Sequence, residues 1–357
     1  MIRWGLCCQF VDADYIKFRS ATHRYVSGLE PAARREYLVQ IARDNAAALA
    51  GAVEYCAMLG IGAFRINSQV LPLATHPVSG YTLATLDETV DLAAEFAAVK
   101  PLAESLGVRL SFHPDQFVVL NSERASVVES SRQELEVQAH LAELVGADLL
   151  TLHVGGATGG VEAAIDRFER TLDTLSDRVR SRLGVENDDR LFSPVDLLPL
   201  CERSGVALVY DSHHHRCHPD ALTVEEASLR AAETWARRDP SIGFAAREPY
   251  FHVSSPRDGW DAKNPRPHGD YVDPADLPPV WRLMDLTVDV EAKEKERAVL
   301  TIMAAARGEI PTEDAVPMED PALGAREGGG DGPDDAGEEE PLDEAPPPDA
   351  ALLEVAA

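Results

Sequence analysis

Eight short apolar runs alternate with longer helical patterns along the chain, and this alternation constrains the fold more than any other feature. The apolar runs cover residues 2–6, 62–66, 108–112, 149–152, 183–185, 207–210, 250–253 and 287–290. The helical patterns, rich in Ala, Leu, Glu and Arg, cover residues 33–59, 86–106, 126–145, 161–175, 195–202, 223–237, 274–283 and 293–307. Because strands that alternate with helices build a parallel sheet, eight such units predict an α/β fold, the (β/α)8 TIM barrel. A doubly wound open sheet is the alternative, although that fold does not require eight units.

Side chains of the types that bind metals stand at the ends of most of the apolar runs. In chain order they are His113, His153, Glu186, Asp211, His252, which lies within the seventh run, and Glu291. The second run contains Arg65 and continues into Asn67 and Ser68. In a barrel the carboxyl ends of all strands open onto one face, where active sites are built. One buried His or Glu is more often a hydrogen-bonded structural residue, but six on successive strands would each need a partner. The sequence therefore predicts a single polar cluster on that face.

The segment 209–218, VYDSHHHRCH, places an acid and four histidines directly after the sixth run. Carboxylate and imidazole together suit zinc, manganese or iron, because both present compact O or N donors near neutral pH. A histidine tract can also be an incidental surface feature, so the segment on its own favours metal binding only modestly.

Several imidazoles and three carboxylates can hold more than one divalent ion, with one carboxylate bridging. Metal ions a few ångströms apart commonly split phosphodiesters, because one acidifies a water molecule and the others neutralise the leaving oxygen and the phosphate. The chain has neither a G-x-S-x-G motif nor a G-x-x-x-x-G-K-[ST] motif. Serine hydrolases and P-loop nucleotide hydrolases are therefore disfavoured.

The acidic charge of the chain is concentrated at its C-terminal end. Of 61 acidic residues, 16 lie within 308–357 together with one of the 33 basic residues, so this segment carries about −15 of the net charge of −28. It is rich in Pro and Gly and poor in large apolar residues, which predicts a disordered tail. The remaining acidic body, a predicted barrel domain at 1–307, argues against holding DNA by bulk charge. Bound divalent cations could still supply positive charge locally.

The expected setting is the cytoplasm. The five cysteines are odd in number and include no C-x-x-C pair, which argues against a disulfide framework or a cysteine zinc module. No apolar run approaches the roughly 20 residues that a membrane helix needs. The first residues contain no apolar core of a signal peptide.

Eight motifs in the same order along the chain resemble the UV damage endonuclease family over residues 1–307. They are 64–77 (FRINSQVLPLATHP), 111–117 (SFHPDQF), 152–156 (LHVGG), 185–189 (VENDD), 211–215 (DSHHH), 252–255 (HVSS), 267–272 (PHGDYV) and 290–295 (VEAKEK). The resemblance implies a barrel related to those of apurinic endonuclease IV and xylose isomerase. It also implies a cluster of two or three divalent ions, usually manganese, with zinc or cobalt as alternatives. The implied reaction cuts damaged double-stranded DNA immediately 5′ to a UV photoproduct, or to an abasic site, and leaves a 3′-hydroxyl.

The resemblance also assigns the metal ligands. It assigns His113 and His153 to one ion, and Glu186 bridges that ion to a second. Asp211, His252 and Glu291 complete the second ion, and a third ion takes His214 and His268. Glu186, Asp211 and Glu291 are then the catalytic carboxylates. The D-x-x-H spacing of Asp211 and His214 suits a chain that turns back after the strand end. His213 and His215 are then expected to point elsewhere, and His218, before a proline, has the weakest claim.

DNA contacts are expected from three places. The resemblance places Gln116 and Phe117 as a pair that probes the damaged duplex; the alternative is that Phe117 is a core residue. Arg65, Asn67 and Ser68 would contact phosphate or support the metal ligands. The loop 254–267 carries Arg257, Trp260, Lys263 and Arg266, which could clamp the DNA backbone or form a solvated loop with one packed tryptophan.

Departures from the family pattern in three regions of the chain leave the substrate range open. Tyr250 stands where several members have a lysine, two residues before the histidine of the seventh strand. Leu6 and the pair at 9–10 differ from the polar and aromatic residues sometimes found after the first strand, and Gln69 replaces a histidine found in some members.

Two other functions remain open. The first is a sugar isomerase or epimerase on the same kind of barrel, which would need a small closed pocket. The second is a non-catalytic role in which the acidic tail recruits repair partners.

The expected enzyme is a monomer that acts on the nucleoid.

Overall fold

A computed structural model describes residues 1–86 and 91–309. Its eight parallel strands close into a barrel in chain order, with β8 paired to β1, which confirms the predicted TIM barrel and excludes the open sheet. The strands are β1 Ile2–Cys7, β2 Ala63–Ile66, β3 Arg109–Phe112, β4 Leu149–His153, β5 Leu183–Glu186, β6 Ala207–Asp211, β7 Tyr250–Val253 and β8 Leu286–Val290.

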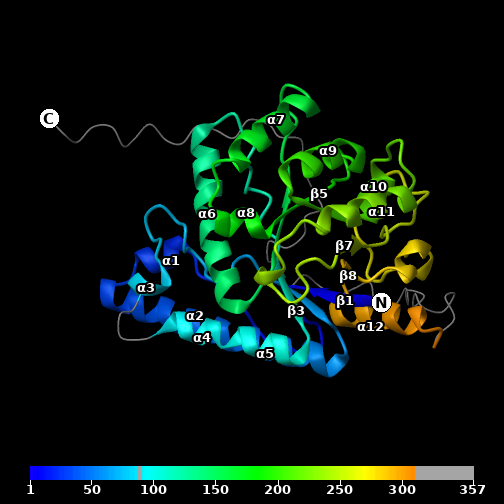
Figure 1. The fold of residues 1–357 in the computed structure, drawn as a ribbon. Coiled ribbons are helices and arrows are strands. Elements are labelled where there is room, and N and C mark those ends of the chain that lie inside the picture. The colour runs from blue at the N-terminus through cyan, green and yellow to red at the C-terminus, as the bar shows by residue number, and fades with distance from the viewer. Residues whose placement is uncertain (87–90, 310–357) are drawn as a thin grey trace. The chain divides into compact units, whose positions relative to one another are not determined.

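Helices surround the barrel (Figure 1). They are α1 His23–Ser27, α2 Pro31–Leu59, α3 Leu83–Leu86, α4 Leu92–Ala97, α5 Val99–Leu106, α6 Ala125–Val145, α7 Val161–Leu172, α8 Asp177–Arg182, α9 Pro194–Ser204, α10 Ser212–Cys217, α11 Val224–Trp235 and α12 Lys295–Ala306. Gly60 caps the C-terminus of helix α2, and Gly205 caps that of α9. Both have positive φ (74° and 78°), a left-handed conformation that glycine adopts without strain. Both glycines turn the chain back toward the next strand.

Three predicted helices differ from the structure. The pattern at 274–283 forms two 3₁₀ turns, Pro274–Asp276 and Pro279–Leu283, because consecutive prolines remove N–H donors and disfavour the α conformation before them. The single helix predicted at 86–106 is divided, and residues 87–90 lie outside the described residues. Pro101 cannot donate to residue 97, where α4 ends. The helix predicted at 161–175 ends at Leu172, and α8 follows it.

The strand register brings the predicted site residues side by side. His153 pairs with Glu186 across β4 and β5, and Asp211 pairs with His252 across β6 and β7. All of these pairs lie at the carboxyl ends of their strands, so the polar cluster forms on the predicted face of the barrel.

The predicted disordered tail at 308–357 lies outside the described residues apart from its first two positions. No helix in the described part of the chain is long and apolar enough to cross a membrane.

Candidate metal centre

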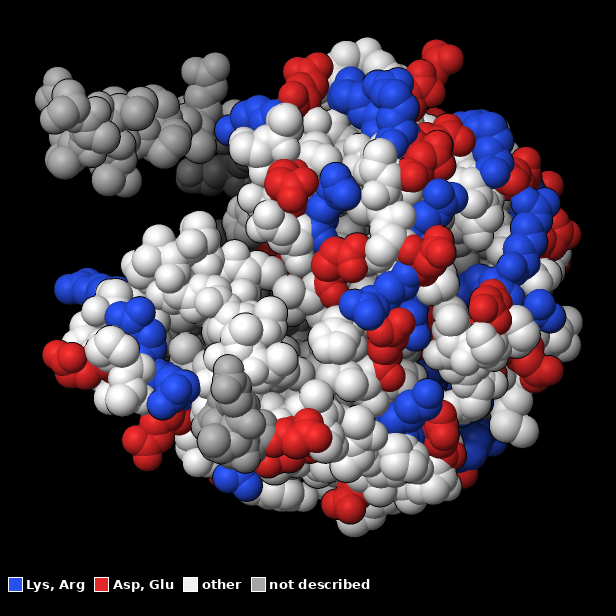
Figure 2. Space-filling model, turned by 60° about the vertical axis from the view of Figure 1, so that its left-hand side comes forward, with Lys and Arg blue, Asp and Glu red and all other residues white. Residues whose placement is uncertain are grey.

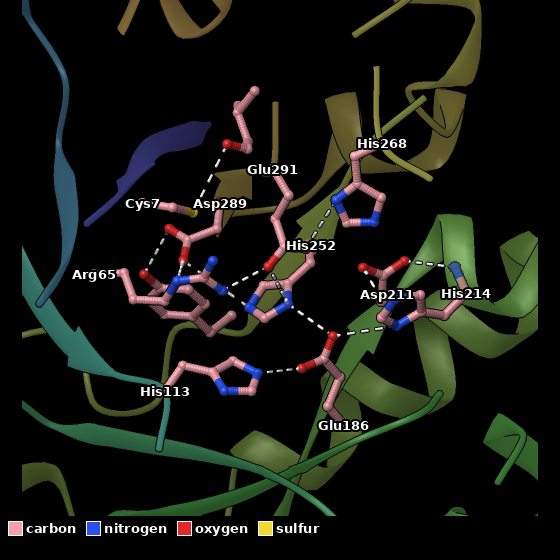
Figure 3. A network of polar contacts seen from close by, with 12 residues as sticks. Cys7, Arg65, His113, Glu186, Asp211, His214, His252, His268, Asp289 and Glu291 are labelled. Carbon is pink, nitrogen blue, oxygen red and sulfur yellow. Dashed lines mark hydrogen bonds and ion pairs between the residues drawn. The ribbon is translucent and has the colours of Figure 1, made fainter. Parts of the chain in front are cut away.

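Glu186, the last residue of β5, lies at the middle of the cluster (Figure 3). Its Oε2 atom is 2.9 Å from His113 Nε2 and 3.6 Å from His153 Nε2. Its Oε1 atom is 2.9 Å from His252 Nδ1 and 3.4 Å from His214 Nδ1. One buried carboxylate therefore contacts imidazoles from four different segments of the chain.

Asp211 closes one side of the cluster and also begins the short helix α10. Its Oδ1 atom accepts a hydrogen bond from the backbone N–H of His214 at 2.7 Å, as an N-cap residue does. This cap turns the chain so that His214 points back at the cluster, where its Nδ1 lies 3.7 Å from Asp211 Oδ2. The Oδ2 atom is buried and has no hydrogen-bond partner in the structure, so it is available as a ligand atom.

Glu291, directly after β8, closes the other side. Its carboxylate oxygens lie 3.5 Å from His252 Nδ1 and 3.6 Å from His268 Nδ1. The guanidinium of Arg65 contacts the same carboxylate at 2.5 Å. Arg65 is thus directed at the polar cluster, and its contacts favour support of the candidate ligands over contact with phosphate.

The donor set fits divalent metal ions. Two groups of three residues each bring their ligand atoms within 4.8 Å of one another. The first group is His113, His153 and Glu186, and the second is Glu186, Asp211 and His252. Two ligand atoms that share one ion at about 2.1 Å are about 3.0 Å apart at a right angle and about 3.4 Å apart at a tetrahedral angle. Glu186 would share an ion with three of its imidazoles, and its separations from these, 2.9 to 3.6 Å, lie near those values; they belong to His113, His153 and His252. Imidazole and carboxylate donors suit manganese, iron or zinc.

The carboxylates create a strongly negative field inside the barrel. Burial raises the pKa of Glu186, but His252 and the other imidazoles outweigh it and hold that pKa well below its usual range. Burial lowers the pKa of His252, but Glu186 and Glu291 outweigh it and raise that pKa to about 9. Burial also raises the pKa of Asp211 to about 6, although His214 lowers it in part. The cluster therefore attracts positive charge. Either protons bind to its imidazoles, or metal ions bind to the imidazoles in place of those protons.

Two histidines of the tract form hydrogen bonds with groups outside the cluster, although the ring of His213 also packs edge-on against His268, with 5.2 Å between the ring centroids. His215 lies between the Tyr210 hydroxyl (2.8 Å) and Asp220 Oδ1 (3.1 Å), which fixes α10 against β6 and the following loop. His213 Nε2 donates to the backbone carbonyl of Arg266 at 3.2 Å, and burial lowers the pKa of His213 to about 4. Both residues are structural.

The predicted aromatic probe is exposed. The Phe117 side chain is 78% exposed, whereas its neighbour Val118 is 6% exposed, so the alternative that Phe117 belongs to the core is wrong. Gln116 is also exposed. The turn that presents them is fixed by Asp115, whose Oδ1 accepts the backbone N–H of Phe117 at 3.0 Å. The pair follows His113 by three and four residues, in the loop at the carboxyl end of β3.

The other predicted DNA-contact residues lie outside the cluster. Asn67 stabilises its own turn, because its Oδ1 accepts the backbone N–H of Gln69 at 2.7 Å, and Ser68 is half-buried. Arg257 and Lys263 are exposed on the loop after β7.

Trp260, in the same loop, is packed as the alternative prediction expected. Its Nε1 donates to Asp276 at 2.9 Å, and the Arg216 guanidinium lies 3.5 Å from the ring centroid. Arg266 pairs with Asp189 at 2.9 Å and is held to the barrel.

Sequence reasoning missed two residues that support the cluster. Asn187 exchanges two hydrogen bonds with the backbone of Asp211, at 2.9 and 3.0 Å. Asp289 pairs with His252 in the register of β7 and β8 and is completely buried. The signal for Asp289 was its position two residues before Glu291, which places both on the same face of β8.

Fold and site together define a class of protein: TIM barrels with a buried histidine–carboxylate centre, able to hold metal ions, at the carboxyl ends of the strands. The chain belongs to the UV-endonuclease UvdE family, whose model matches residues 2–318. This confirms the resemblance that the eight motifs indicate.

Named relatives and solved structures agree with this membership. The chain is 34% identical to the UV DNA damage endonuclease of Deinococcus radiodurans over 308 residues, which is 84% of this chain and 93% of the relative. It is 30% identical to that of Bacillus velezensis, over 80% of this chain and 87% of the relative. The crystal structure of SacUVDE superposes with a TM-score of 0.74 at 25% identity, covering 87% of this chain and 99% of that chain. Endonuclease IV from Thermus thermophilus, at 20% identity and a TM-score of 0.52, covers 86% of this chain and all of that chain and shares the fold.

Proposed function

We propose that this protein hydrolyses the phosphodiester bond immediately 5′ to UV photoproducts in double-stranded DNA, leaves a 3′-hydroxyl, and uses a centre of two or three divalent metal ions. Its family makes it a DNA repair endonuclease. The observation that carries the finer proposal is the position of Glu186, whose two oxygens lie 2.9 to 3.6 Å from four imidazole nitrogens. Abasic sites are a second proposed substrate.

Each proposed ion has its own ligands. His113, His153 and Glu186 would hold the first, Glu186, Asp211, His252 and Glu291 the second, and His214 and His268 the third. Manganese is the proposed metal, with zinc or cobalt as alternatives. When bound, the ions supply the charge that acidifies a water molecule and neutralises the leaving oxygen.

The protein groups prepare the site for that chemistry. Glu186, Asp211 and Glu291 are the proposed catalytic carboxylates, and their burial keeps bulk water from competing for the ligand positions. Arg65 holds Glu291 through an ion pair, and the α10 cap holds His214. These contacts fix the ligand geometry before substrate arrives.

DNA recognition would depend on shape more than on charge. On the face drawn in Figure 2, Lys and Arg side chains are interspersed with Asp and Glu side chains and do not gather in a single basic patch. We assign lesion probing to Gln116 and Phe117, because an exposed ring beside the centre can stack into a base step that damage has loosened. Asn67, Ser68, Arg257 and Lys263 are proposed backbone contacts. The proposed enzyme acts as a monomer in the cytoplasm, on the nucleoid.

Nicking of supercoiled plasmid tests the proposal. UV-irradiated plasmid with manganese should be converted to the open-circular form, and unirradiated plasmid should not. His113→Ala and Glu291→Gln should abolish the conversion. A metal-loaded protein that leaves irradiated plasmid intact would contradict the proposal. A sugar isomerase would show the same inactivity on DNA, but an exposed phenylalanine beside the centre does not suit a closed sugar pocket.

A further inference from the structure

Three polar atoms beneath the metal centre are buried and have no hydrogen-bond partner among the described residues. They are Arg65 Nε on β2, His252 Nε2 on β7 and Asp289 Oδ2 on β8. Asp289 Oδ2 lies 3.9 Å from the arginine nitrogen and 4.0 Å from the histidine nitrogen. Figure 3 shows the three side chains turned toward one another, with His252 between the other two and Glu186. Buried polar groups without partners are rare, so this arrangement needs an explanation.

The other oxygen of Asp289 is held in place. The Tyr250 hydroxyl donates to Asp289 Oδ1 at 2.7 Å. Since that proton is used, the Ser111 hydroxyl, 2.9 Å away, must donate to the Tyr250 oxygen. Gly5 leaves room for the carboxylate, because a Cβ at Gly5 would collide with Asp289 Oδ1. Asp289 is therefore fixed with Oδ2 directed at His252 and Arg65.

The ring of His252 needs an acceptor at Nε2. Its Nδ1 faces Glu186 at 2.9 Å and Glu291 at 3.5 Å, so Nδ1 is the nitrogen that would bind an ion. A neutral ring then carries its proton on Nε2. Histidines that bind metals almost always donate this second N–H to a carboxylate, a carbonyl or a water molecule.

One buried water molecule would satisfy all three atoms. A distance of 4.0 Å is too long for a direct hydrogen bond. Two atoms that each lie about 2.8 Å from one water molecule, at a right angle, are about 4.0 Å apart. The water would accept from the two N–H groups and donate one of its protons to the carboxylate, so each of the three protein atoms would gain a partner.

We propose that Asp289, held by Tyr250, is a positioning residue for the metal centre, and that it acts on His252 and Arg65 through one buried water molecule. Asp289 fixes the ring of His252 with Nδ1 toward the ions. It also fixes Arg65, which holds Glu291. This inference rests on the proposed metal centre and adds residues that the ligand assignment does not contain.

Asp289→Asn tests the inference with little change in shape. If Tyr250 donates to the amide oxygen, the amide N–H₂ group faces the two N–H donors, and three donors then meet. His252 can relieve this by moving its proton to Nδ1, which blocks that nitrogen as a ligand. We expect manganese affinity to fall by about 10- to 100-fold, as for other residues that orient metal ligands. Tyr250→Phe should weaken binding in the same direction by less.

Two measurements and one control variant make the result specific. Titration of the apoprotein with manganese, followed by electron paramagnetic resonance of the free ion, gives affinity and stoichiometry. Nitrogen-15 spectra of the histidine side chains of the zinc-loaded protein report the tautomer of His252, the nitrogen that binds the ion and the one that keeps the proton, which a merely structural role of Asp289 would not change. Tyr81→Phe is the matched control, since Tyr81 donates to the Pro72 carbonyl and makes no contact with the centre; its affinity should equal that of the wild type.

Asp289→Asn with wild-type affinity and tautomer would overturn the inference and leave the proposed function intact. A wild-type protein that binds no divalent ion would overturn both. If Asp289→Asn fails to fold, Tyr250→Phe decides, and a folded Tyr250→Phe with unchanged affinity overturns the inference.

Discussion

Replacing Phe117 with alanine should separate lesion recognition from stability. The side chain is 78% exposed, so its removal should change the free energy of unfolding by no more than about 0.5 kcal/mol. If the ring stacks into the damaged step, its loss should cost about 1–3 kcal/mol of binding. At 1.4 kcal/mol per factor of ten, this is about a 5- to 140-fold loss of affinity for a duplex with one photoproduct. Fluorescence anisotropy with labelled lesion and undamaged duplexes measures it.

The matched control is Phe244→Ala. Phe244 is 51% exposed and packs against Arg3, at the start of β1 and so at the opposite end of the strands from the metal centre. Its removal should leave the ratio of lesion to undamaged affinity unchanged. The reasoning is refuted if Phe117→Ala keeps the wild-type ratio, or if both variants lose it equally.

Three further predictions follow from the same contacts. Glu186→Gln should lose nicking and bind fewer metal ions, because the amide has no negative charge and only one oxygen to offer among the four imidazoles. Wild-type metal content in this variant, measured by elemental analysis, would argue against a bridging role. Metal removal by EDTA should lower the melting temperature by about 4 °C, since saturation at 100 times Kd stabilises a protein by about 2.7 kcal/mol; an unchanged melting curve would count against tight binding. His215→Ala should lower the free energy of unfolding, measured by urea denaturation, by about 1–3 kcal/mol, because it leaves Tyr210 and Asp220 without their buried partner. An unchanged free energy would show that contacts other than these two hold α10 in place.

The strands and their polar ends could be predicted because the sequence changes abruptly there. Each strand is a short apolar run, and a ligand-type residue such as His113 or Glu186 follows or ends it. Since all carboxyl ends in a barrel meet on one face, the cluster followed from the fold alone. The assignment of individual ions to particular ligands stays a prediction.

The supporting residues could not be predicted because their roles depend on contacts between strands. The register pairs Asp289 with His252, and the Tyr250 hydroxyl reaches Asp289 in the space that Gly5 leaves; neither contact is visible in the sequence. Helix α10 was missed because a run of histidines has no helical pattern; the cap by Asp211 creates the helix. The proline-rich segment at 274–283 was misread because its apolar spacing suggested a helix that prolines do not allow.

The central claim is that the barrel face carries a metal-dependent centre that cuts DNA beside a UV lesion. A duplex oligonucleotide with one defined photoproduct, incubated with protein of measured metal content, tests it most directly. We predict a single cut immediately 5′ to the lesion, a 3′ end that a polymerase can extend, and no cut with His113→Ala. Intact duplex with a fully loaded wild-type protein, or equal cutting by His113→Ala, would contradict the account.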